Sequence, residues 1–494
     1  MADEGDIRLH VVHTGRDGTL ASTSEADVRE MFGLIKQERR LVVHFHGGLV
    51  DRASGFQIAR SLRPVYEAAG AYPVFFVWSS GITEIVRGNF REILQESIFK
   101  TVRTWVLRYA YGKLRQSEDA RAAGALPIPR TRDVRDELAA LDRDAEPYAD
   151  VEPVAPVAEL SPDERLTIES EVAADPTLTG QIAAATGSVD GARGIGVAEG
   201  PTRTLVSPDV LEELTTAPDG SRGIVSTAAV GRKVAQIVVA VIGRYRAGTD
   251  HGLYCTAVEE VLRALYLANL GAALWQAIKQ ETRDTFARGT PTRGGALFLD
   301  ELERLLATGA ELEITLVGHS TGAIFIENLL AELRRRRTGP ARVKNVAYLA
   351  PASIFPGSWQ MLEHWPEVAE NFRLFAMTDE AERRDHVAPG YPRSLLYLVS
   401  GVAERDRDRS AWVPLVGMAR YYVDPRGEPL TGDRFEDLSG VRDVRAFMAG
   451  GGRTVWSPTP ADAAAGFRAA ARTHGGFDDD PEVRASLQQM IKSD

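Results

Sequence analysis

A short turn, GHSTG at residues 318–322, lies between an apolar strand and an apolar helix in this 494-residue sequence. Residues 314–317 (ITLV) are rich in β-branched side chains, as expected of a buried parallel strand. Residues 323–333 place apolar side chains at helical spacing. A serine on a sharp strand-to-helix turn has strained backbone angles and a hydroxyl raised above the sheet edge. The pattern therefore predicts that Ser320 is a nucleophile.

Strand-like and helix-like runs alternate on both sides of this turn. The alternation predicts an α/β fold with a mostly parallel, doubly wound sheet. Each expected strand is a short apolar run, and the run at residues 41–50 continues into a glycine turn. The expected strands are residues 7–13, 41–50 with that turn, 72–78, 314–317, 343–349, 372–377 and 395–399.

The alternation stops for more than two hundred residues in the middle of the chain. We expect residues 1–81 and 294–494 to form the core, and residues 82–293 to form a large, mainly helical lid or cap insertion. From about 116 to 223 the composition shifts to Ala, Pro, Asp, Glu and Gly with few aromatic residues. This stretch is predicted to be loop-rich and partly disordered, with short helices at 132–141 and 162–172.

Two segments of the insertion, residues 234–242 and 264–278, are strongly apolar. They predict buried lid or bundle helices, and contact with a membrane surface or an acyl chain is the alternative. Neither reaches the roughly 18 consecutive apolar residues of a membrane-spanning helix. The insertion is also the expected place for a protein partner to bind.

Charge and cysteine content limit the class of protein. A net charge of −11 and a pI near 5.5 argue against a general nucleic-acid partner. The single cysteine, Cys255, excludes an intrachain disulfide and fits a reducing compartment. The acidic N-terminus, MADEGDIRLH, lacks the apolar core of a signal peptide. We therefore expect a soluble cytoplasmic protein.

A serine hydroxyl needs a base to take its proton, and the base needs an acid that orients it. The predicted base is His474, in the sequence RTHGGF, because it lies in a loop ahead of the closing helix and is followed by two glycines. Two carboxylates are candidates for the acid. Asp379 follows the expected strand at 372–377 most closely, and Asp385 lies in the same loop. The sequence slightly favours Asp379.

Acyl transfer also needs hydrogen-bond donors for the oxyanion. One predicted donor is the main-chain N–H of Thr321. The second is expected from HGGL at residues 46–49, where Gly47, Gly48 and Leu49 present main-chain N–H groups. A structural role for His46 in bracing this turn is compatible with that function.

These motifs together resemble the α/β-hydrolase family. The glycine turn follows an early strand, and the chain order of serine, acid and histidine matches that of the family. The resemblance covers about residues 7–81 and 294–494, and it implies that Ser320 is the nucleophile and His474 the base. It also implies Asp379 or Asp385 as acid, and Thr321 with Gly47, Gly48 and Leu49 as oxyanion hole. Leu49 stands where lipase-type turns usually have a third glycine, and the insertion precedes the usual position of a lid.

The predicted activity is that of a serine hydrolase, esterase- or lipase-like, which cleaves a carboxylic ester or thioester through an acyl-enzyme. No metal or organic cofactor is required for this chemistry. The apolar helices of the insertion are expected to shape an acyl pocket or cover the site. An acyltransferase would use the same triad while excluding water. A non-catalytic signalling or scaffold protein on the same fold is the third alternative.

Overall fold

The computed structural model contains two compact units. The core unit consists of residues 1–83, 274–385 and 414–494, and the helical unit consists of residues 84–273 and 386–413. The structure describes part of each unit. The described residues are 4–48, 50–78, 83–119, 134–141, 145–149, 159–178, 180–181, 204–215, 227–266, 272–336, 343–405 and 412–493.

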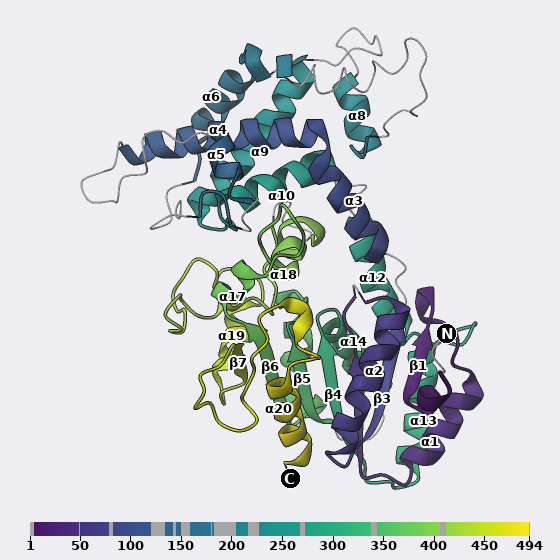
Figure 1. The fold of residues 1–494 in the computed structure, drawn as a ribbon. Coiled ribbons are helices and arrows are strands. Elements are labelled where there is room, and N and C mark those ends of the chain that lie inside the picture. The colour runs from purple at the N-terminus through teal and green to yellow at the C-terminus, as the bar shows by residue number, and fades with distance from the viewer. Residues whose placement is uncertain are drawn as a thin grey trace, which may run out of the picture. The chain divides into compact units, whose positions relative to one another are not determined.

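The core unit is built on a seven-stranded, all-parallel sheet, shown with its helices in Figure 1. The order across the sheet is β1-β3-β2-β4-β5-β6-β7. Because strand β4 is central and its carboxyl end leads into residues 318–322, the serine turn stands at the middle of one sheet edge. The strands are β1 Val11–Thr14, β2 Arg40–Phe45, β3 Tyr72–Trp78, β4 Glu313–His319, β5 Val343–Leu349, β6 Asn371–Met377 and β7 Thr454–Ser457.

Helices cover both faces of this sheet. Alternate strand residues point to opposite faces, and in β2 the ring of Phe45 stacks on Phe325 of helix α14 while His44 bonds to Tyr66 of helix α2. Helices α2 and α20 share one buried apolar core with the sheet. On the other face are α1, α13 and α14. The bounds are α1 Glu25–Ile35, α2 Arg52–Glu67, α12 Ala272–Asp284, α13 Gly294–Ala307, α14 Gly322–Arg336, α15 Phe355–Leu362, α16 Trp365–Val368, α17 Asp379–Arg384, α19 Val441–Ala449 and α20 Pro481–Lys492.

Most expected strands are present, and three local predictions are wrong. Residues 7–10 belong to a 3-10 helix, η1 Glu4–His10, and only β1 is extended. Residues 395–398 form helix α18 because the Ser394 hydroxyl accepts a hydrogen bond from the Tyr397 N–H and begins a turn. A short apolar run fits either structure by pattern alone. The edge strand β7 lies in a charged stretch for which the sequence predicts no strand.

The helical unit has a buried apolar core of its own. Its segment 234–242 belongs to α9, and Val234, Val238, Val241 and Ile242 are buried in that core. Within the stretch 116–223, residues 120–133, 142–144, 150–158, 179, 182–203 and 216–223 lie outside the described residues, as do 267–271 of the second apolar segment. The helices are α3 Thr83–Gln95, α4 Ser97–Asp119, α5 Val134–Leu138, α6 Pro162–Ala173, α8 Pro208–Thr215, α9 Thr227–Ala247, α10 Leu253–Leu265 and α18 Leu395–Leu398.

Across the described parts of both units, every helix is too short or too polar to cross a lipid bilayer.

Candidate functional site

The serine turn, residues 318–322, has the strained geometry that its sequence predicts. Ser320 has a φ of +54°, in the left-handed region that non-glycine residues rarely adopt. A Cβ on Gly318 would lie 2.5 Å from the Gly322 carbonyl oxygen, and a Cβ on Gly322 would lie 2.1 Å from the carbonyl oxygen of Phe45. Both distances are far inside van der Waals contact, so only glycine fits on either side of this serine.

The main chain of Ser320 is fixed by the end of the neighbouring strand β5. Its N–H donates to the Leu349 carbonyl at 2.8 Å, and its carbonyl accepts from the Ala352 N–H at 3.1 Å. Helix α14 begins at Gly322, so its N-terminal dipole lies next to the serine, where it favours negative charge. The Ser320 residue is 4% exposed. The turn therefore holds a nearly buried serine rigidly at a helix N-terminus.

The glycine turn, residues 46–48, packs directly against the serine turn. A Cβ on Gly47 would lie 3.4 Å from the Cβ of Ser320, and one on Gly48 would lie 2.6 Å from the Thr321 hydroxyl. Within the described residues, the main-chain N–H groups of Gly47 and Thr321 have no hydrogen-bond acceptor. Donors from two separate segments thus lie beside the serine, as an oxyanion site requires. Leu49, also predicted to contribute, lies outside the described residues.

His46 braces the glycine turn. Its Nε2 accepts from the Trp78 main-chain N–H at 3.2 Å, so its Nδ1 carries the proton and donates to the Gly47 carbonyl at 2.8 Å. Its ring stacks on Trp78, with ring centres 5.5 Å apart. Burial lowers the pKa of His46 to about 4, which keeps it neutral near pH 7. This histidine has a structural role in the turn.

His474, the predicted base, lies in a short 3-10 helix, η7 His474–Gly476, and is buried. Its main-chain N–H donates to Oδ2 of Asp385 at 2.7 Å. Neither ring nitrogen has a hydrogen-bond partner among the described residues. Burial, with the nearby His319, lowers the pKa of His474 to about 3, so the ring is neutral near pH 7.

The structure places the two candidate acids at opposite ends of helix α17. Asp379 begins this helix directly after β6 and Thr378, and Asp385 follows its last residue. Asp385 meets His474, but through the main-chain N–H. Because the ring nitrogens of His474 have no partner in the described chain, serine, imidazole and carboxylate are not joined by side-chain hydrogen bonds here.

A cluster of two histidines and an aspartate, which was not predicted from the sequence, lies next to His474. His319, next to Ser320, contacts Asp478 through Nδ1 at 2.7 Å and the His474 carbonyl through Nε2 at 2.8 Å. Nε2 of His44 lies 3.5 Å from the other oxygen of Asp478. We call His44, His319 and Asp478 the histidine–aspartate cluster. Asp478 belongs to the aspartate run 478–480, of which Asp480 caps helix α20.

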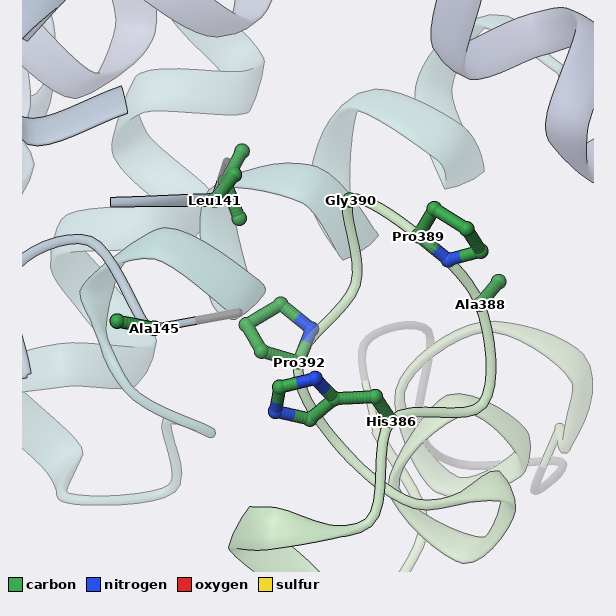
Figure 2. Close-up of a pocket in the computed structure, with 7 residues that line it drawn as sticks. All are labelled: Leu141, Ala145, His386, Ala388, Pro389, Gly390 and Pro392. Carbon is green, nitrogen blue, oxygen red and sulfur yellow. The ribbon is translucent and has the colours of Figure 1, made fainter. Parts of the chain in front are cut away.

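The described part of the helical unit contains a pocket of about 170 Å³, drawn in Figure 2. Small and apolar residues make up most of its lining, and His386, which is exposed, is its one ionisable member. The lining residues are Leu141, Ala145, His386, Ala388, Pro389, Gly390 and Pro392.

Among the described residues, no group of three or more His, Cys, Asp or Glu side chains is arranged to hold a metal ion. Comparison with known proteins gives no relative: no protein-family model, curated protein or solved structure matches the chain.

Proposed function

We propose that this chain is a serine hydrolase of the α/β-hydrolase type, and that it cleaves a carboxylic ester or thioester through an acyl-enzyme on Ser320. The observation that carries the proposal is the φ of +54° at Ser320 between two glycines that cannot carry a Cβ. Left-handed strain at a non-glycine residue costs roughly 1–3 kcal/mol and occurs mostly at functional sites. A serine that only packs against its neighbours does not require this conformation.

The architecture supports the family assignment. The strain lies at the carboxyl end of the central strand β4, directly before helix α14, as in a nucleophile elbow. The residues along the chain follow the order Ser320, carboxylate, His474 that the family uses. The parallel sheet with helices on both faces and a helical region between β3 and β4 fits the same type.

In the proposed reaction, the Ser320 hydroxyl oxygen attacks the carbonyl carbon while its proton passes to His474. The carbonyl oxygen becomes an oxyanion beside the main-chain N–H groups of Thr321 and of the glycine turn. Collapse of this intermediate transfers the proton from His474 to the leaving alcohol or thiol. Water then attacks the acyl-enzyme, gives its proton to His474 and releases the acid, which restores the Ser320 hydroxyl.

His474 must turn its ring toward Ser320 and toward an acid during this cycle. Catalytic hydrogen bonds often shorten only when substrate is bound, so their absence without substrate does not exclude the role. Asp385 is the better supported acid because its carboxylate already bonds to His474. Asp379 is the alternative, at the end of β6. A rotation of the imidazole about its side-chain bonds must bring a ring nitrogen to the Asp385 carboxylate, which can keep its bond to the main-chain N–H.

A fluorophosphonate probe tests the nucleophile. The wild-type protein should be labelled, and Ser320→Ala should not be labelled. The matched control is Ser493→Ala, which removes an exposed serine hydroxyl at the C-terminal end of α20 and should label like wild type. If the wild type is not labelled, the hydrolase proposal is wrong and the scaffold alternative gains support.

Acceptor competition separates hydrolysis from acyl transfer. Turnover of p-nitrophenyl esters is measured in water and with added alcohol or amine. A hydrolase releases the free acid in both cases, whereas an acyltransferase forms the new ester or amide. A series of acyl chain lengths in the same assay defines the substrate class.

A further inference from the structure

The side chain of His319 bridges two acceptors. Asp478 offers a carboxylate oxygen 2.7 Å from Nδ1, and the His474 carbonyl oxygen lies 2.8 Å from Nε2. A carbonyl oxygen accepts hydrogen bonds and never donates them. Nε2 of His319 must therefore carry a proton.

The second contact places a further proton between Nδ1 of His319 and Asp478. Two arrangements satisfy the geometry: an imidazolium facing a carboxylate, or a neutral ring facing a carboxylic acid. In water a histidine holds its proton with a pKa of about 6.5 and an aspartate with a pKa of about 3.9, so the proton prefers His319. His319 is then a buried imidazolium ion paired with the Asp478 carboxylate.

The other charged and titratable groups around His319 leave this assignment in place. His44 and His46 come from the end of β2, and burial lowers the pKa of each to about 4, so both stay neutral. Asp479 adds a negative charge that raises the pKa of His319. Tyr66 and Arg484 are the remaining neighbours of Asp478. Tyr66 bonds to His44, and Arg484 bonds to the Asp478 carbonyl.

We propose that His319, held as an imidazolium by Asp478, is a positioning residue for His474. The main chain of His474 is fixed on both sides, by Asp385 at its N–H and by His319 at its carbonyl, while its ring nitrogens have no hydrogen-bond partner among the described residues. The ring centres of His319 and His474 are 5.4 Å apart, so the positive charge of His319 lowers the pKa of His474. This role rests on the proposed function, but the charge of His319 does not.

Nitrogen NMR of histidine-labelled wild-type protein tests the charge directly. Protonated and unprotonated ring nitrogens have distinct shifts, and a His319→Gln spectrum assigns the His319 signals among the nine histidines. We expect two protonated nitrogens at His319 and one at His474 at neutral pH. A single protonated nitrogen at His319 would overturn the proposal, whether or not the protein hydrolyses esters.

Kinetics of two His319 variants separate the hydrogen bond from the charge. His319→Ala removes both, and kcat/KM should fall about 10- to 100-fold, mainly through kcat, which is the effect of losing one charge-assisted hydrogen bond. His319→Gln keeps an amide donor for the His474 carbonyl without the charge. Its rate should fall less, and the acidic limb of its pH–rate profile should move to higher pH because His474 becomes easier to protonate.

The control is His364→Gln, a histidine at the N-cap of α16 whose Nε2 lies 3.4 Å from Glu363, which should match wild type in rate and pH profile. An unchanged acidic limb in His319→Gln would refute the charge effect. Unchanged rates in His319→Ala would refute the positioning role. If the wild type turns over no ester, the proposed function fails while the NMR result still decides the state of His319.

Discussion

Replacing Ser320 with glycine should make the protein more stable than replacing it with alanine. Both variants lose the hydroxyl, and both should lose fluorophosphonate labelling. They differ in the Cβ atom, which strains the backbone at φ +54°, close to the left-handed minimum near +57°. Glycine adopts this conformation without strain.

The size of the difference follows from two opposing terms. A non-glycine residue in the left-handed region costs roughly 1–2 kcal/mol. Glycine costs roughly 0.4–1 kcal/mol more conformational entropy on folding than alanine. The free energy of unfolding of Ser320→Gly should therefore exceed that of Ser320→Ala by about 0.5–1 kcal/mol.

Urea unfolding followed by tryptophan fluorescence measures this difference. Gly309→Ala is the matched control, because Gly309 has a φ of +84° and open space where a Cβ would lie. The free energy of unfolding of Gly309→Ala should lie below that of wild type by about 0.5–1 kcal/mol, the same difference that we expect between Ser320→Gly and Ser320→Ala. If Gly309→Ala is destabilised while the two Ser320 variants are equally stable, the serine turn is not strained. The argument from backbone strain that Ser320 is a nucleophile then fails.

Three further predictions concern the site. Gly48→Ala should lower kcat about 10²- to 10³-fold by displacing an oxyanion donor, because its Cβ would lie 2.6 Å from the Thr321 hydroxyl. The control Gly33→Ala, in open space on α1, should leave ester turnover unchanged. Asp385→Asn should lower kcat at least about 100-fold and Asp379→Asn should not; the reverse result in the same assay would identify Asp379 as the acid. The free energy of unfolding should decrease as the pH falls below about 6.5, because the unfolded chain protonates His474 whereas the pKa of His474 in the folded protein is about 3. The urea midpoint should therefore fall less between pH 7 and pH 5 in His474→Gln than in wild type.

Local sequence patterns predicted secondary structure correctly where the apolar pattern matches the burial of the side chains. The run Tyr72–Trp78 is a strand over its whole predicted length because it is buried on both faces of a parallel sheet. Helix α1 begins directly after Ser24, whose hydroxyl accepts from the Asp27 N–H in a capping box, a local pattern typical of a helix N-terminus. These features depend on neighbours in sequence, so the sequence is enough to predict them.

Local patterns failed where a distant partner decides the structure. Strand β7 forms because its residues pair with β6, some eighty positions earlier in the chain. At Leu395–Leu398 the apolar run is equally compatible with a strand, and a serine cap starts a helix instead. The pairing of Asp478 with His319 was not predicted, since nothing near Asp478 in sequence indicates a histidine 159 positions away.

The sequence by itself determined the serine turn, since a serine between two glycines after an apolar strand is a local property of the chain. Only the tertiary structure decided what surrounds that serine. It packs the glycine turn against Ser320, places Asp385 on the main chain of His474 rather than on its ring, and pairs His319 with Asp478. The physical reason is that backbone strain and strand formation depend on neighbouring residues, whereas hydrogen bonds and protonation states depend on which distant groups share a buried environment.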